Sequence, residues 1–283
     1  VEEGPSYILE LISWGAEFDK DGSRLSFTRE AAHTKRRIVH SHGDSTGKEI
    51  DRVLITKARS FSSISRYDFA FTLDLIIEDG KCIGASVLRN DKKIDIYAKA
   101  VILATGGAGH LYSRTTNPMI TTADGIAIAY RAGALIKDME FIQFHPTTLY
   151  GKNVLITEGA KGEGGFLVNN KGERFLANYA DSRKAMEVAP RDIISRNMTK
   201  EIMEGRGLEG GYLHLDLRHL GREKILARLP WIREICLEFA GIDPIDEPIP
   251  VQPGQHYTTG GIDCNTECET RIKGFYAAGE AAC

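Results

Sequence analysis

The sequence predicts an α/β protein with more than one domain, and three observations support this prediction. Alternating apolar and polar residues over 67–99 predict short antiparallel strands. The all-apolar run AVILA at 100–104 predicts a strand buried on both faces, as in a parallel sheet. Segments with helical spacing of apolar residues lie on both sides of this region. A chain of 283 residues has room for about two domains of ordinary size.

The composition excludes several classes of function. The chain is 42% hydrophobic and 27% charged, as in a soluble globular protein. A net charge of −3 gives no electrostatic argument for binding nucleic acid. No apolar run reaches the roughly 18 residues that span a membrane, and no secretory signal opens the chain. The five scattered cysteines suit a reducing cytoplasm, and the single pair Cys264 and Cys268 predicts no metal site.

The first sixty residues predict two helices joined by a loop. Residues 5–15 carry apolar side chains at helical spacing and end at Gly15, a common helix stop. Residues 18–46 are polar, basic and rich in histidine, which predicts an irregular segment. Residues 46–60 return to a helical pattern.

The middle of the chain predicts a meander of three strands that leads into the strand at 100–104. Its turns are expected at Asp79-Gly80 and Asn90-Asp91. A helix is expected over 123–133, with Asp124 near its start and Gly133 as its stop.

The second half alternates strands and helices. A hairpin is expected to turn at 170–172, and Pro190 is expected at the first position of a helix over 190–205. A strand over 212–220 and an amphipathic helix over 221–240 follow. The four prolines of 241–255 predict a crossing loop.

Two strand ends are rich in glycine and form the candidate cofactor-binding region. Ligands bind at the carboxyl ends of parallel strands, where glycine lets the backbone approach them closely. Each segment also fits a tight turn, but together they favour a nucleotide site. Asp124 fits either a ligand hydroxyl or the cap of its own helix. The candidate residues are Ala104, Thr105, Gly106, Gly107, Asp124, Gly279 and Glu280.

Polar residues at predicted loops and helix starts form a second candidate group. A lone histidine such as His145, after an apolar run, is more often a satisfied core residue than a ligand. His256 also fits an ordinary loop residue, and Thr157-Glu158 fits a turn or cap. Arg191 is different, because a cation in the first turn of a helix meets the positive end of the helix dipole, at a cost of roughly 0.3–1 kcal/mol. Together these residues suit a small dianion with two carboxylates.

The basic segment before the second helix has two interpretations. TREAAHTKRR is either an anion site or a solvated face, and a charge run is usually the latter. His40 and His42 could chelate a metal, but no third ligand of matching spacing is evident.

Six long motifs resemble one family of flavoproteins. They are MEFIQFHPTTLY, LITEGAKGEGGFLVNNKGERF, APRDIISR, LHLDLRHLG, HYTTGGI and GFYAAGEAA. In this order they resemble the succinate dehydrogenase, fumarate reductase and L-aspartate oxidase family. The resemblance implies a Rossmann-like FAD-binding domain that is interrupted by an α+β capping domain. Residues 1–140 would be the middle of the FAD domain, 141–254 the cap, and 255–283 the return to the FAD domain.

The resemblance also implies residue roles. Arg191 matches the arginine that transfers a proton beside the substrate, and Glu158 and Lys161 match the rest of that relay. The family usually has arginine at position 161; lysine can carry a proton but lacks the planar fork of guanidinium. His145 and Thr157 match donors to one substrate carboxylate, and His256 matches a donor to the other.

The stretch TREAAHTKRRIVHSHGDSTGKEI resembles the L-aspartate oxidase branch. In that branch a glutamate faces the amino group of the substrate, and Glu30 matches it. The resemblance then implies oxidation of L-aspartate to iminoaspartate by hydride transfer to flavin N5. Oxygen or fumarate would reoxidise the flavin, and cytoplasmic quinolinate synthase would take the product toward NAD. The Phe-Gly-Gly-type segment of dehydrogenase subunits is not found.

Two alternatives remain open. The chain could instead be the flavoprotein subunit of a succinate dehydrogenase or fumarate reductase, which needs an iron–sulfur partner. The chain also lacks the dinucleotide fingerprint that holds a pyrophosphate at a helix start. The chain is therefore expected to be an internal fragment of a longer enzyme, and the fragment itself is expected to bind FAD weakly or not at all and to be inactive.

Overall fold

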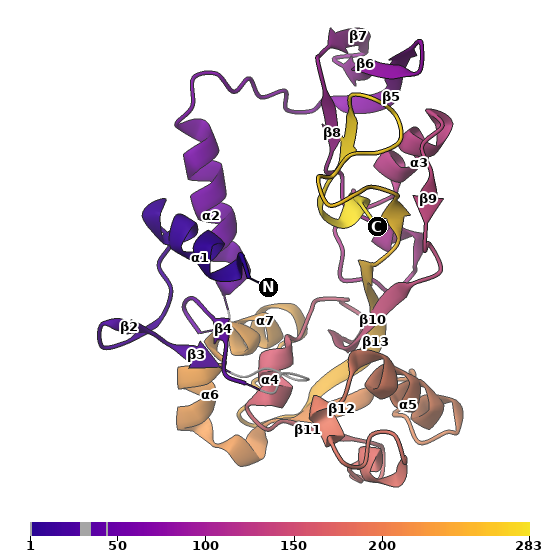
Figure 1. The fold of residues 1–283 in the computed structure, drawn as a ribbon. Coiled ribbons are helices and arrows are strands. Elements are labelled where there is room, and N and C mark those ends of the chain that lie inside the picture. Colours follow the sequence, from indigo (N-terminus) through magenta and orange to yellow (C-terminus); the bar gives the residue numbers. More distant parts are fainter. Residues whose placement is uncertain (1, 29–34, 44) are drawn as a thin grey trace. The chain divides into compact units, whose positions relative to one another are not determined.

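The computed structural model describes residues 2–28, 35–43 and 45–283. The chain divides into two compact units (Figure 1). The first unit combines Val1–Ser65 with Pro146–Pro253, and the second combines Arg66–His145 with Gly254–Cys283. The boundary after residue 65 has no counterpart among the boundaries expected from the sequence.

The first 65 residues hold the two helices that the sequence predicts, α1 (Gly4–Ser13) and α2 (Thr46–Arg59). Ala16, Phe18 and Val53 are buried and form a small core between them. The segment predicted to be irregular contains two short antiparallel pairs. These are β1 (Lys20–Asp21) with β2 (Arg24–Leu25), and β3 (Phe27–Thr28) with β4 (Ile38–Val39).

A four-stranded sheet in the order β10-β13-β12-β11 organises the rest of the first unit. Its leucine-rich core includes Leu149, Leu167, Leu213 and Leu215, all fully buried. The strands are β10 (Ile142–Leu149), β11 (Phe166–Val168), β12 (Leu213–Asp216) and β13 (Ile249–Thr258). The helices are α4 (Glu158–Gly162), α5 (Arg191–Met203), α6 (Arg222–Arg228) and α7 (Pro230–Ala240). Short 3-10 helices lie at Phe175–Asn178, Met186–Val188 and Arg218–Leu220.

Three predictions for this unit were wrong in detail. The turn at 170–172 forms, but β11 pairs with β12 rather than with a strand after the turn. The helix expected over 221–240 is two helices, because Pro230 cannot continue α6 and instead starts α7. The proline-rich loop is shorter than expected, since β13 already begins at Ile249.

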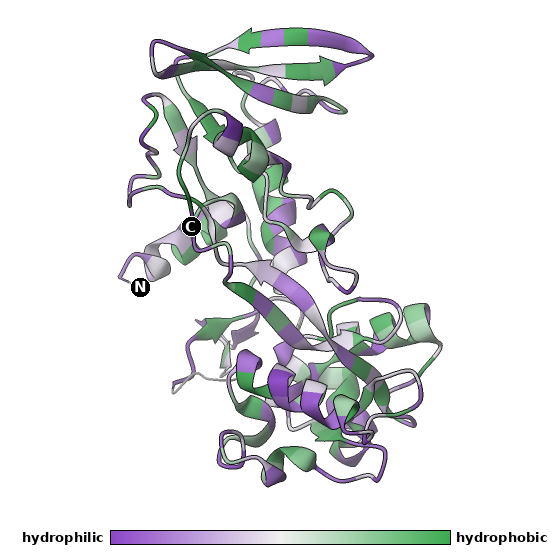
Figure 2. Cartoon of the chain, turned by 90° about the vertical axis from the view of Figure 1, so that its right-hand side faces the viewer, coloured by the Kyte–Doolittle hydropathy of each residue, from purple (hydrophilic) through white to green (hydrophobic). Residues whose placement is uncertain are grey.

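The second unit contains the predicted meander of β5 (Phe71–Glu78), β6 (Lys81–Arg89) and β7 (Lys92–Tyr97). Figure 2 shows green and purple residues interspersed along these strands. Strand β8 (Val101–Leu103) pairs in parallel with β15 (Phe275–Ala277). Helix α3 (Asp124–Arg131) packs on this core, and β9 (Ile136–Lys137) pairs with β14 (Gly261–Ile262). Short 3-10 helices span Gly109–Leu111 and Gly279–Ala281.

The apolar strand β8 is buried on one face only within the described chain. Leu103 is 5% exposed and belongs to the core, whereas Ile102 is 65% exposed. The parallel pairing that its composition predicts is present, but the expected burial on both faces is not.

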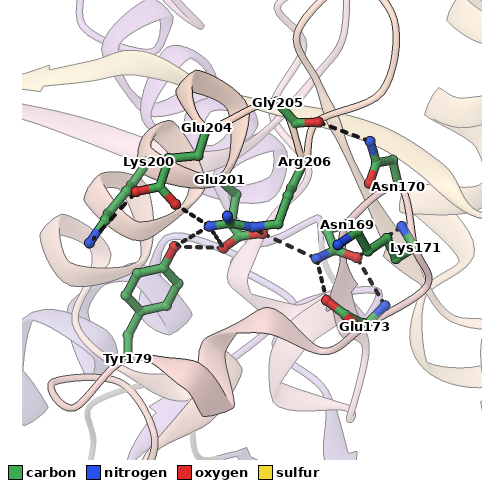
Figure 3. Close-up of polar contacts among 10 residues, drawn as sticks. All are labelled: Asn169, Asn170, Lys171, Glu173, Tyr179, Lys200, Glu201, Glu204, Gly205 and Arg206. Atoms are coloured by element: carbon green, nitrogen blue, oxygen red, sulfur yellow. Dashed lines mark hydrogen bonds and ion pairs between the residues drawn. The ribbon is translucent and has the colours of Figure 1, made fainter.

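A buried carboxylate fixes the end of α5 (Figure 3). Glu201 is 1% exposed and receives hydrogen bonds from Arg206, the Tyr179 hydroxyl and the Asn169 amide. Burial alone raises the pKa of Glu201, but these hydrogen bonds outweigh it and hold the pKa below its usual value. Burial and the bond to Glu201 raise the pKa of Tyr179 to about 12, so Tyr179 is the donor. This network joins α5 to the turn after β11.

Candidate active site

The short helix α4 presents a buried acid beside a buried base. Thr157 precedes the helix with extended backbone, φ −63° and ψ 162°, and Glu158 is the first helical residue. Glu158 is 6% exposed, and the side chain of Lys161 is completely buried. They lie three residues apart, so one turn of helix places both side chains on the same face.

Glu158 receives two cationic side chains on a single oxygen. Lys161 Nζ lies 2.9 Å from Glu158 Oε1, and Arg191 Nε lies 3.3 Å from the same atom. Arg191 is the first residue of α5. Pro190 is the N-cap of this helix, whereas the sequence predicted it at the first helical position. The carboxylate offsets the unfavourable helix dipole at this arginine. About a third of the Arg191 side chain remains exposed, so the arginine connects the buried group to the surface.

Burial changes the acid–base behaviour of Lys161. Removal from water lowers the pKa of this ammonium group, and the nearby carboxylates of Glu158 and Glu187 act in the opposite direction. The net shift is downward, so Lys161 loses its proton more readily than a lysine in water. Lys161 Nζ and Glu158 Oε1 are 2.9 Å apart, which is close enough for a proton to pass between the two groups.

A cavity of about 230 Å3 lies within the first unit beside α4. Its wall includes Thr157, the first residues of α2 and His40. Thr157 Oγ1 is buried and has no hydrogen-bond partner in the described part of the chain, and the same holds for His40 Nε2. Arg228 and Glu163 also line the cavity and form an ion pair with each other at 3.0 Å.

Asp19 holds His40 in one orientation. Its carboxylate accepts hydrogen bonds from the backbone N–H groups of His42 and Gly43 and lies 2.7 Å from His40 Nδ1. Burial alone raises the pKa of Asp19, but these hydrogen bonds outweigh it and keep the pKa below its usual value. The carboxylate is therefore ionised, and Nδ1 carries the proton that it accepts.

In the second unit the structure brings His145 and His256 together. Their rings meet edge to face with 5.2 Å between centroids. His145 is 1% exposed, and His256 Nδ1 lies 2.7 Å from the hydroxyl of Thr116. The Asn117 amide donates to the carbonyl of His256 and fixes the backbone there. No local pattern predicts Thr116 or Asn117, because their contacts with His256 span about 140 residues of chain.

The two glycine-rich strand ends also meet. Strands β8 and β15 are parallel neighbours, so Ala104–Gly107 and Gly279–Glu280 emerge at the same edge. Gly107 is required there, because a Cβ would lie 2.5 Å from Glu280 Oε1 and 2.6 Å from Thr258 Oγ1. Glu280 accepts the backbone N–H of Thr258, and Thr258 Oγ1 accepts that of Ala108. One oxygen of Glu280 thus positions the backbone.

Asp124 lies at the same end of the second unit without capping its helix. The N-cap of α3 is Ala123, and no side chain caps this helix. Asp124 is exposed and accepts a hydrogen bond from Thr122, while Ala123 N–H bonds to the carbonyl of Gly107. Gly125 leaves space for Thr105, whose Oγ1 would lie 1.9 Å from a Cβ. Asp124 therefore does not cap α3, and its contact with a ligand hydroxyl stays a prediction.

Some expectations fall outside what the structure describes. Glu30 lies outside the described residues.

Among the residues that are described, no group of three or more His, Cys, Asp or Glu side chains could hold a metal ion. No helix in these ranges has the length and apolar character needed to cross a bilayer.

The chain is similar to several known flavoproteins along its whole length. A family model described as FAD binding domain matches residues 1–283. The fumarate reductase flavoprotein subunit of Proteus vulgaris is 40% identical over 296 residues, covering 100% of the chain and 50% of that protein. The chloroplastic L-aspartate oxidase of Oryza sativa is 42% identical over 301 residues, covering 99% and 45%. A structure of quinol fumarate reductase from E. coli matches with a TM-score of 0.95 and 38% identity, covering 100% and 51%. The chain thus spans about half the length of these relatives.

Proposed function

The chain belongs to the FAD-binding domain family that includes the succinate dehydrogenase and fumarate reductase flavoproteins, and from this premise we propose that the complete protein is an FAD-dependent oxidoreductase that oxidises L-aspartate to iminoaspartate. The observation that carries the proposed oxidation chemistry, for either candidate substrate, is the buried group of Glu158, Lys161 and Arg191. Two cations on one buried carboxylate oxygen, with one of them reaching the surface, suit proton transfer coupled to oxidation of a small substrate.

FAD is the cofactor of this family, and the residues at the edge of β8 and β15 fit it. Gly107 and Gly125 keep the backbone clear of side chains, as close approach of a dinucleotide requires. The exposed side chains of Thr105 and Asp124 offer hydrogen-bonding groups at the same edge. We propose that Ala104–Gly107, Asp124 and Gly279–Glu280 hold the cofactor. When bound, FAD supplies the acceptor for the hydride of the substrate carbon.

Proton transfer falls to the protein side chains. A guanidinium group holds its protons too tightly to be present as a free base. Arg191 therefore accepts a substrate proton only as its own Nε proton passes to Glu158. Glu158 Oε1 lies 2.9 Å from Lys161 Nζ, which takes the proton when the lysine is neutral. Burial increases the share of neutral lysine, which is the form that can accept a proton.

The proposed substrate contacts follow from the candidate residues. Thr157 and His145 would bind one carboxylate, and His256 the other, through charge-assisted hydrogen bonds. Glu30 would pair with the ammonium of L-aspartate, whereas succinate has no cation there and its two carboxylates would be repelled by Glu30. The 42% identity to a plant L-aspartate oxidase supports this choice. We further propose a cytoplasmic protein that supplies quinolinate synthase, with oxygen or fumarate as the electron acceptor.

A succinate dehydrogenase or fumarate reductase flavoprotein subunit is the second candidate. It is supported by the 40% identity to the fumarate reductase subunit of Proteus vulgaris and by the TM-score of 0.95 to the E. coli structure. The same relay and carboxylate donors would serve this reaction, so the choice depends on the region around Glu30.

The test is anaerobic mixing of the full-length, flavin-loaded protein with L-aspartate or with succinate. Loss of flavin absorbance with L-aspartate alone is expected. Loss of absorbance with succinate alone would instead assign the protein to the second candidate. No loss with either substrate would contradict oxidation of both of these dicarboxylates.

A further inference from the structure

His40 is a buried imidazole with one committed nitrogen and one uncommitted nitrogen. The residue is 7% exposed, and Asp19 fixes Nδ1 at 2.7 Å. Nε2 is also buried and has no hydrogen-bond partner within the described ranges. Leaving a buried polar atom unpaired is costly, so such an atom indicates a missing partner.

The partner belongs in the cavity beside α4. His40 and Thr157 both line this cavity of about 230 Å3, and the hydroxyl of Thr157 is the second buried polar atom there without a partner. Two such atoms on the wall of one cavity define a site for a small polar ligand.

The charges around the cavity favour an anion. Thr46 and Gly47 also line it and form the first turn of the 14-residue helix α2, whose N-terminal end is positive. Because Nδ1–H is committed to Asp19, Nε2 is the ring nitrogen of His40 that is left for a ligand, and in the imidazolium form it donates a hydrogen bond to an anion. Arg228 and Glu163 pair with each other and cancel in charge.

We propose that His40 is a further substrate-binding residue, whose Nε2 donates a hydrogen bond to the same substrate carboxylate that Thr157 Oγ1 binds. The inference rests on the proposed function, because it takes the ligand of the cavity to be the dicarboxylate substrate. Asp19 is then a positioning residue, since it acts only through His40. The sequence had offered His40 only as a candidate metal ligand.

The test compares three variants of the full-length, flavin-loaded protein. His40→Asn keeps an amide N–H near the position of Nδ1 for Asp19 and removes the group at Nε2. His40→Gln places an amide donor near the position of Nε2. His42→Asn is the matched control, because His42 is exposed, does not line the cavity and has a φ of 49° that asparagine tolerates.

The probes are malonate and the substrate that reduces the flavin. Malonate has no amino group and no pair of adjacent saturated carbons, so neither candidate reaction can oxidise it. Its Kd is measured from the change in flavin absorbance, together with kcat and KM. His40→Asn is expected to raise Kd and KM at least about tenfold with kcat within about threefold, because the lost contact is made equally in ground and transition states. His40→Gln should recover most of this loss, and His42→Asn should match the natural protein.

Two results would overturn the inference. Equal malonate affinity in His40→Asn and His42→Asn would remove His40 from the site, while the natural protein still showed the proposed activity. Equal loss of bound FAD in His40→Asn and His40→Gln would show a structural role instead. Failure of the natural protein to be reduced by either dicarboxylate would place the fault in the proposed function itself.

Discussion

At the scale of single residues, Lys161 stands where the resemblance to the flavoprotein family implies an arginine. An arginine at this point would remain charged at all accessible pH values, whereas lysine can release its proton when it is buried. Lys161 has a fully buried side chain and bonds to Glu158, which also receives Arg191. The proposed relay therefore contains a lysine whose pKa is lowered by burial.

We expect Lys161→Gln to slow flavin reduction by about 10²- to 10⁴-fold, the range over which positioned acid–base groups act. Lys161→Arg should remain active, but its rate of flavin reduction should no longer rise with pH in the way expected for the natural protein. The pKa of Lys161 is lowered, so its neutral, proton-accepting form appears at lower pH than in a free lysine, and the natural rate should rise as pH increases through that pKa. Stopped-flow absorbance across a pH series measures this.

The matched control is Lys152→Gln, because Lys152 is exposed at a turn. Its rate and pH profile should equal those of the natural protein. Identical pH profiles for the natural protein and Lys161→Arg would show that Lys161 does not titrate in the reaction.

At the scale of elements, α5 carries the proposed proton-transfer residue Arg191 at its start and a buried hydrogen-bond network at its end. Arg191 opens the helix beside Glu158, and Glu201 lies three turns later in the network with Arg206 and Tyr179. The buried network at one end holds the helix in place, and this fixes the position of Arg191 at the other.

Glu201→Gln should lower the free energy of unfolding by about 2 kcal/mol, because a buried carboxylate that accepts charged hydrogen bonds is lost. Glu204→Gln is the control. Glu204 also pairs with Arg206 but is 43% exposed, so its loss should cost about 0–1 kcal/mol. Urea denaturation of the full-length protein measures both. Equal stability losses would show that burial of Glu201 contributes nothing.

The contribution of Glu201 to the free energy of unfolding is also expected to depend on pH. The pKa of Glu201 is lowered in the folded state, so its stabilisation is fully present above the unfolded pKa of about 4.3 and is lost as pH falls through the folded pKa. The stability difference between the natural protein and Glu201→Gln should therefore shrink below about pH 4.3. A difference that grew in acid would contradict this sign.

At the scale of the whole molecule, local sequence patterns predicted the helices and strands better than they predicted contacts between distant residues. The helices α1, α2, α3 and α5 and the strands of the meander follow the periodicity of the sequence, because each depends on neighbours a few residues apart. The parallel pairing of β8 with β15 was also predictable in kind from the apolar run. The split between α6 and α7 was missed because the amphipathic pattern continues through Pro230.

The candidate site shows the same division. The motifs identified Glu158, Lys161 and Arg191 through a family resemblance, but no local pattern shows that two cations share one oxygen of Glu158. His40 and Thr157 are separated by more than a hundred residues and come together on one cavity wall. Only the folded first unit reveals that Asp19 turns His40 from a candidate metal ligand into a candidate anion donor.

The central claim, that the group around Glu158 moves the proton during substrate oxidation, is tested most directly by the rate of anaerobic flavin reduction in Arg191→Gln. The control is Arg196→Gln, which alters an arginine on the same helix that is 70% exposed and pairs with Asp192. Both full-length proteins are loaded with FAD and mixed with saturating L-aspartate. The account predicts a loss of about 10²- to 10⁴-fold for Arg191→Gln and a change within about twofold for Arg196→Gln. Equal rates in the two variants would contradict it.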